Sequence, residues 1–187
     1  MFQQVSIEDV DLMFENKEAK VIANYNEPEI ELAGFKVGPF EEGREYEIRY
    51  WVAEELEKMG IIRFREEDML DVVKLHKIHW KERVQPTNKA SPLPEDFYPK
   101  LRRYLAQLEK ASRNNGEKLK ELEKSARISK DVINSRVKKV VSLASSLPLT
   151  SHALQDLTPE ERALYHCLHN VINEWRKKIL ERGKKQW

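Results

Sequence analysis

The spacing of the apolar residues changes near residue 68, and this change limits the folds that are open to the chain. Before it, short stretches such as residues 44–50 alternate apolar and polar side chains, as strands with one buried face do. After it, apolar residues recur every three or four positions over long stretches, as they do in amphipathic helices. The sequence therefore predicts an α+β protein. A small N-terminal β-rich domain with an N-terminal helix, residues 1–65, precedes a larger α-helical bundle domain, residues 66–187.

Glycine and proline residues divide the N-terminal part into short elements. The expected elements after the first helix are strands at residues 29–32, 44–50 and 61–64, and a helix at residues 51–59. Gly60 is expected to end that helix in a left-handed conformation. The first helix is expected to start at Ser6 as its N-cap and to carry an apolar stripe of Val10, Met13 and Phe14.

A Gly-Pro-Phe sequence followed by a further glycine stands between two of these strands. Gly38 permits backbone conformations that are closed to other residues, and Pro39 fixes the next φ angle. Phe40 can then fold back as a plug on the small domain. We interpret Gly38, Pro39, Phe40 and Gly43 as a structural turn. A direct contact of Phe40 with a partner is the alternative.

Several apolar stripes follow in the helical part. Asp68 is expected to cap a helix whose apolar stripe is Leu70, Val73, Trp80 and Val84, with Lys77 in the same stripe extending its amine to solvent. A later stripe describes one long helix, or two joined near Ser129, that ends before Pro148. A Thr-Pro-Glu-Glu sequence at residues 158–161 has the form of a capping box and predicts the start of the last helix.

Two of the helical stripes exceed what one small bundle needs, so we predict that one of them packs against a partner subunit. The predicted interface residues are Leu101, Tyr104, Leu105 and Leu108 in the first stripe, and Leu164, Leu168, Val171 and Trp175 in the second.

The near-neutral net charge of +1 hides an uneven distribution. Residues 1–68 carry 18 acidic and 8 basic side chains, whereas residues 69–187 carry 14 acidic and 25 basic side chains. The two parts therefore have formal charges of −10 and +11. This asymmetry favours modules with different partners. Mutual attraction of the two parts, or simple solvation of both, is an equal alternative.

Sequence signatures of catalysis are missing. There is no phosphate-binding loop of the G-x-x-x-x-G-K-[ST] type. His76 with His79, and His166 with His169, are spaced to share a metal ion, but neither pair has a third ligand at helical spacing. Cys167 and His166 are adjacent on a helix and so point about 100° apart, which does not suit a nucleophile and its base. We expect no enzymatic activity and no catalytic, cofactor-binding or metal-binding residues.

Membrane and nucleic-acid binding are also not expected as direct functions. No apolar run approaches the roughly 20 residues of a membrane span, and the first residues lack the pattern of a signal peptide. The basic helical stretches are interleaved with glutamates, so nucleic-acid binding is expected to be indirect or weak. A winged-helix regulator that begins at Thr158 is the alternative function, although only about 30 residues remain for its recognition helix and wing.

Several segments, taken in order, resemble one protein family. The run Leu32-Ala-Gly-Phe-Lys-Val-Gly-Pro-Phe-Glu-Glu-Gly43, then Tyr46-Glu-Ile48, then Trp51-Val-Ala-Glu-Glu-Leu56, resembles the N-terminal module of GINS subunits. Asp71 to Arg83 and Ser91 to Tyr98 resemble the parts that follow in that family, so the similarity covers essentially the whole chain. The order, with the β module first, resembles the eukaryotic subunits called Psf two and Psf three. The short chain is similar to their single archaeal counterpart.

The resemblance implies a non-catalytic protein of DNA replication that works without a cofactor. Four subunits would form a heterotetramer, with two copies each of this chain and of a sister GINS subunit. The assembly would bind and activate the minichromosome maintenance replicative helicase together with a RecJ-like protein, and would dock a polymerase or primase. Such a protein is expected in the cytoplasm, associated with the nucleoid at replication forks.

Overall fold

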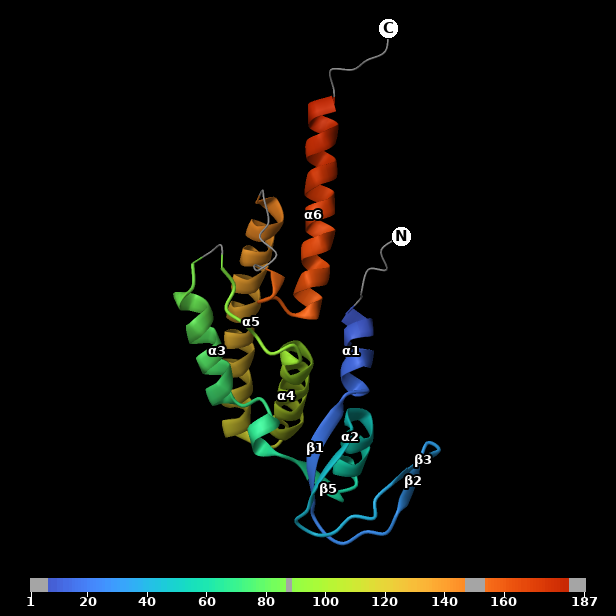
Figure 1. The fold of residues 1–187 in the computed structure, drawn as a ribbon. Helices are drawn as coiled ribbons and strands as arrows, with labels where there is room; N and C mark the ends of the chain where they lie inside the picture. Colours follow the sequence, from blue (N-terminus) through green and yellow to red (C-terminus); the bar gives the residue numbers. More distant parts are fainter. Residues whose placement is uncertain (1–6, 87–88, 147–153, 182–187) are drawn as a thin grey trace. The chain divides into compact units, whose positions relative to one another are not determined.

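A computed structural model describes residues 7–86, 89–146 and 154–181 of the chain (Figure 1). The predictions that Ser6 caps the first helix and that Pro148 ends the long one fall outside these residues. Glu8–Leu70 form one compact unit, which contains the strands, and the helices that follow Asp71 form a second. The α+β fold class, with the small β-rich part first and the helical bundle second, is confirmed. The domain boundary between residues 65 and 66 stays a prediction.

The β-rich unit is built around its first strand, β1 (Glu18–Ala23). It lies between β4 (Glu45–Arg49) and β5 (Ile62–Phe64) in an antiparallel sheet. Val21 and Ala23 of this strand are fully buried, which explains why it holds the central position. β1 is not among the strands expected from the sequence, whereas β4 and β5 are.

Two helices and a hairpin complete this unit. They are α1 (Ile7–Glu15), α2 (Tyr50–Lys58), and the hairpin of β2 (Ile30–Leu32) with β3 (Phe35–Val37). The Tyr50 ring lies 4.3 Å from the Phe14 ring and 5.3 Å from the Phe64 ring, so aromatic contacts join α1, α2 and β5. Gly60 has a φ angle of 78° after α2, which confirms the predicted left-handed end. Met13, expected on the buried side of α1, is 62% exposed.

The Gly-Pro-Phe turn packs its phenylalanine into this core. Phe40 is 2% exposed, and its ring meets that of Tyr46 at a centroid distance of 5.0 Å. Gly38 has a φ angle of +101°, and a Cβ atom there would lie 3.3 Å from Cδ2 of Phe40. Glycine therefore serves both the backbone conformation and the close packing at this position. These contacts agree with a structural role for the turn.

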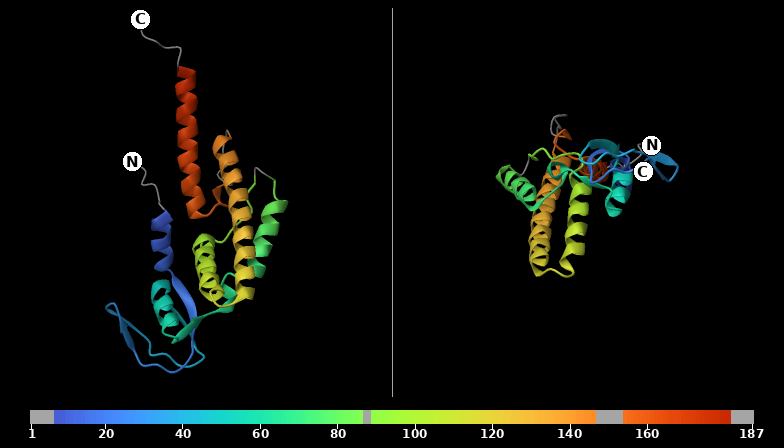
Figure 2. Two further views of the ribbon diagram at one scale, coloured as in Figure 1. Left: turned by 180° about the vertical axis from the view of Figure 1, so that it is seen from behind. Right: turned by 90° about the horizontal axis from the view of Figure 1, so that it is seen from below.

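The helical unit is organised around one long helix, α5 (Gly116–Ser145) (Figures 1 and 2). The helices that pack on it are α3 (Val72–Val84), α4 (Phe97–Ser112) and α6 (Pro159–Leu180). Of the two predicted alternatives for the long segment, a single uninterrupted helix is therefore correct. Its length lets one element bury residues against three neighbours (Figure 2).

The N-cap of α6 is the one predicted from the sequence, whereas the N-cap of α3 is not. Thr158 forms the predicted capping box, in which its hydroxyl accepts from the Glu161 N–H and the Glu161 carboxylate accepts from the Thr158 N–H. The cap of α3 is Asp71, whose carboxylate accepts from the Lys74 N–H at 2.7 Å. Asp68, the predicted cap, lies in a short 3₁₀ turn instead. The expected helix therefore starts one turn later than predicted.

Candidate interaction surfaces and the charge network that positions them

A buried arginine on α5 joins the helices of the second unit. Arg136 is 1% exposed. Its Nε donates to Oε1 of Glu161 on α6 at 2.8 Å, and its Nη1 donates to Oε2 of Glu82 on α3 at 3.2 Å. The same guanidinium also donates to the backbone carbonyls of Ser91 and Asp156. One side chain thus fixes α3, α6 and the two segments that lead away from α3 and into α6.

A second buried cation completes the network. Lys139 is 3% exposed, and its Nζ lies 2.7 Å from Oε1 of Glu82. It also donates to the Glu82 backbone carbonyl at 2.9 Å. Two cations therefore face two carboxylates, Glu82 and Glu161, and their formal charges cancel. Such pairing is what makes ionised groups tolerable in an interior.

The environment of Glu82 holds its carboxylate in the ionised form. Burial alone would raise the pKa of Glu82. The hydrogen bonds from Lys139 and Ser91, together with the charge of Arg136, outweigh this and hold the pKa below its ordinary value of 4.5. Burial raises the pKa of Tyr98, and so do the charge of Glu161 and the hydrogen bond that the Tyr98 hydroxyl donates to it at 2.7 Å. Glu82 is therefore ionised and Tyr98 is neutral near neutral pH.

The network determines which side of α3 faces the core, and the predicted side is wrong. Leu75 and Glu82 are buried, at 0% and 1% exposure. Val73, Trp80 and Val84, the predicted core stripe, are 56%, 67% and 62% exposed. Because Glu82 turns inward to Arg136 and Lys139, the apolar stripe on the opposite side turns outward.

The first predicted interface stripe is covered within the chain. Leu101, Tyr104 and Leu108 of α4 are 3%, 7% and 5% exposed, and α4 packs on α5. The Tyr104 hydroxyl lies 3.1 Å from Oγ of Ser125 on α5. Leu105 is partly buried. These three side chains already pack within the bundle, so the prediction that one of the two stripes meets a partner now concerns the second stripe.

Of the second predicted stripe, on α6, only Leu168 packs against the core. Near its start, Tyr165 is 2% exposed, and Leu168 packs against the core cluster at the end of α5. Further along, Nη2 of Arg176 donates at 2.7 Å to the carbonyl of Ser145, the last residue of α5. Figures 1 and 2 show α6 continuing past this end of α5. The later part of α6 therefore has no α5 to cover it.

Four of the exposed apolar residues of α6 share one side of the helix, and we call them the α6 surface: Leu164, Val171, Trp175 and Ile179, which are 37%, 60%, 63% and 50% exposed. Spacings of seven, four and four residues place them on one side of the helix. The charges beside them are balanced, because Glu174 pairs with Lys178 at 2.6 Å and Glu181 with Lys177 at 3.8 Å. Three of the four residues belong to the predicted interface.

The structure also gives the surroundings of the histidines and the cysteine that the sequence singled out. The described part of the chain holds no group of three or more His, Cys, Asp and Glu side chains that could bind a metal ion. His79 faces Asp131 at 4.0 Å, and His169 contacts the Ala144 carbonyl at 3.3 Å, so both histidines have ordinary structural neighbours. Cys167 is exposed. None of the helices among the described residues is long and apolar enough to cross a membrane.

Comparison with known proteins gives two consistent results. Residues 69–180 match the family model described as Sld5, GINS complex protein helical bundle domain. The chain is also 30% identical, over 97 residues, to the human protein named DNA replication complex GINS protein PSF2, and 29% identical over 97 residues to the Xenopus laevis protein of that name. Each alignment covers 52% of this chain and 51% of the relative. The chain thus spans about half the length of the curated relatives it matches.

Proposed function

The chain belongs to the GINS family, and on this premise we propose that it is a non-catalytic subunit of a GINS complex that acts in DNA replication. The family match spans most of the helical unit, and the curated relatives carry a replication complex in their names. The alternative of a winged-helix regulator is not retained. Between residues 71 and 181, the described segments form helices and provide no strand for a wing.

The α6 surface is the proposed contact with a sister GINS subunit, and this is the single observation that carries the assembly proposal. When a partner covers a row of large apolar side chains, their removal from water lowers the free energy and favours binding. Exposed tryptophans in such rows often contribute most to binding. The balanced charges along α6 fit the polar rim of a stable interface.

The finer parts of the proposal rest on family membership. The assembly would contain two copies each of this chain and of the sister subunit. It would bind and activate the minichromosome maintenance helicase with a RecJ-like protein, dock a polymerase or primase, and act in the nucleoid at replication forks. Its mechanism would be architectural, since it would hold helicase subunits in an active arrangement.

Co-purification with the sister subunit tests the assembly. The full chain and the sister subunit are co-expressed and analysed by size-exclusion chromatography with light scattering. Trp175→Asp is expected to separate the two proteins, because it places a charge in an apolar contact. Trp80→Asp, at 67% exposure compared with 63% for Trp175, is the matched control and should leave the complex intact. Equal behaviour of the two variants would remove the α6 surface from the proposal.

A further inference from the structure

We propose that the outer face of α3 docks an acidic amphipathic helix of a partner protein, separately from the α6 surface. This α3 surface consists of Val73, Lys77, Trp80, Lys81 and Val84. It is the stripe that the charge network turns away from the core. The proposal does not depend on binding to the sister subunit.

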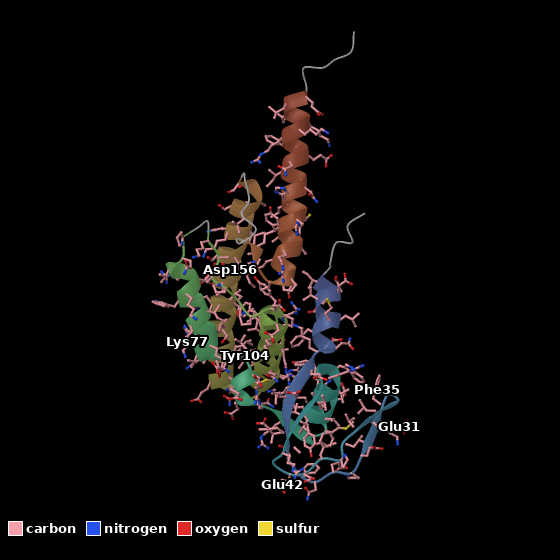
Figure 3. All side chains as sticks on the ribbon, in the orientation of Figure 1. Glu31, Phe35, Glu42, Lys77, Tyr104 and Asp156 are labelled. Carbon is pink, nitrogen blue, oxygen red and sulfur yellow. The ribbon has the colours of Figure 1, made fainter. Side chains whose placement is uncertain are left out.

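The α3 surface forms one ridge, in which the aliphatic stem of Lys77 lies between Val73 and Trp80. Residues 73, 77, 80 and 84 are separated by four, three and four positions and so form one ridge along the helix. Val73, Trp80 and Val84 are more than half exposed. Figure 3 shows Lys77 on α3. A ridge of this spacing fits against a second helix, whose side chains enter the gaps between those of the first.

The charged residues of α3 that flank this surface are cationic. Lys77, Lys81 and Arg83 are exposed, and the only acidic residue of α3 is Glu82, which is buried in the network. Lys81 and Arg83 lie on opposite sides of the apolar ridge, because they are about 160° apart around the helix. No carboxylate on α3 itself offsets these charges. A partner with apolar side chains between two rows of carboxylates is complementary to this arrangement.

A protein helix fits these features better than a nucleic acid does. Single strands bind to basic surfaces through aromatic side chains on which successive bases stack. The α3 surface has one aromatic residue, Trp80, between two valines that offer no stacking plane. A phosphate backbone would pair with the lysines and leave Val73 and Val84 in water. An acidic apolar helix would cover both.

The surface is held in place before a partner arrives. Glu82 stands on the opposite side of α3 and is fixed by Arg136 and Lys139, so the helix cannot rotate without breaking buried ion pairs. Because α3 is already ordered, less conformational entropy is lost when a partner binds. The α6 surface differs, because carboxylates and lysines alternate beside it. The two surfaces therefore suit partners of different charge.

Binding of two synthetic helices to the full chain tests the proposal. The probe is an amphipathic peptide of about 18 residues, long enough to form a helix, with a leucine stripe between glutamate rows; its control has lysines in place of the glutamates. By fluorescence anisotropy, the acidic peptide should bind, and more weakly as salt rises. The lysine peptide should not bind. Trp80→Ala should weaken binding about tenfold or more, whereas Trp175→Ala should leave it unchanged.

Charge reversal and an oligonucleotide provide the decisive arms. The double variant Lys77→Glu with Lys81→Glu should lose the acidic peptide and gain the lysine peptide. Circular dichroism checks that each variant keeps its helices. Failure of the acidic peptide to bind, or binding that Trp80→Ala leaves unchanged, overturns the proposal. An oligo(dT) strand of about 20 nucleotides is the competitor. If it displaces the peptide, and if Trp80→Ala no longer binds this strand, the surface binds nucleic acid and the proposal is overturned.

Discussion

Arg136 of α5 and Glu82 of α3 are 54 residues apart in the sequence, yet they form an ion pair in which each side chain is 1% exposed. This pair fixes the rotation of α3 about its axis. Glu82 faces inward, so Trp80 and its apolar neighbours face outward. The pairing of Glu82 with Arg136 and Lys139 therefore determines which side of α3 is exposed.

Removal of the Glu82 charge should strongly destabilise the helical unit. Glu82→Gln leaves Arg136 and Lys139 buried with one carboxylate fewer, and breaking a buried pair in this way costs about 3–5 kcal/mol. Urea denaturation followed by circular dichroism measures the loss in the free energy of unfolding. The control is Glu174→Gln on the surface of α6, which breaks an exposed pair and should leave the free energy of unfolding nearly unchanged. Similar losses in the two variants would show that the buried network stabilises the fold no more than an exposed ion pair does.

The Glu82 carboxylate should also make the free energy of unfolding depend on pH. The folded pKa of Glu82 lies below its ordinary value of 4.5, so the folded state favours the ionised form. The stabilisation is therefore fully present above about pH 4.5 and is lost as the pH falls through the folded pKa. The midpoint of urea denaturation, measured from pH 7 down to pH 3, should fall in this window. Glu82→Gln should make the fall smaller, and an unchanged profile would contradict the assignment.

Local patterns in the sequence predicted the features that depend on neighbouring residues. The capping box at Thr158, the left-handed end at Gly60 and the general α+β order are confirmed, because each depends on a few adjacent residues. The exposed row on α6 also lies on residues that the helical spacing identified. Of this row, Ile179 lies beyond Arg176, which contacts the last residue of α5.

Features that depend on distant contacts could not be predicted in this way. The buried side of α3 contains Glu82, and only the arrival of Arg136 and Lys139 from α5 makes its burial favourable. A hydrophobicity pattern treats such a glutamate as exposed and so selects the opposite face. The stripe on α4 was correctly identified as apolar, but its spacing does not tell whether α5 or another chain covers it. The only sequence signal for the network is a single glutamate in an otherwise cationic helix.

Truncation of Phe40 should loosen the β-rich unit and spare assembly. Phe40 is 2% exposed, and Phe40→Ala should cost about 3–5 kcal/mol through lost contacts and a cavity. This is comparable to the whole stability of a unit this small. Hydrogen exchange should show faster exchange in β1, β4 and β5, while gel filtration still shows the complex with the sister subunit. If Phe40→Ala abolishes assembly and Trp175→Asp does not, the proposed roles of the two units are reversed.

Loss of the Thr158 cap should weaken the attachment of α6 rather than unfold the bundle. The Thr158 hydroxyl accepts from the Glu161 N–H, and Glu161 in turn binds Arg136, so the start of α6 is held at a single corner of the network. Thr158→Ala should cost about 1 kcal/mol and raise hydrogen exchange in the first turns of α6. Thr158→Ser keeps the hydroxyl and should remain near the wild type. Because the α6 surface is carried on this helix, the alanine variant should also release the sister subunit more readily in a dilution series. Unchanged exchange in α6 together with unchanged binding would show that packing on α5 alone positions the helix.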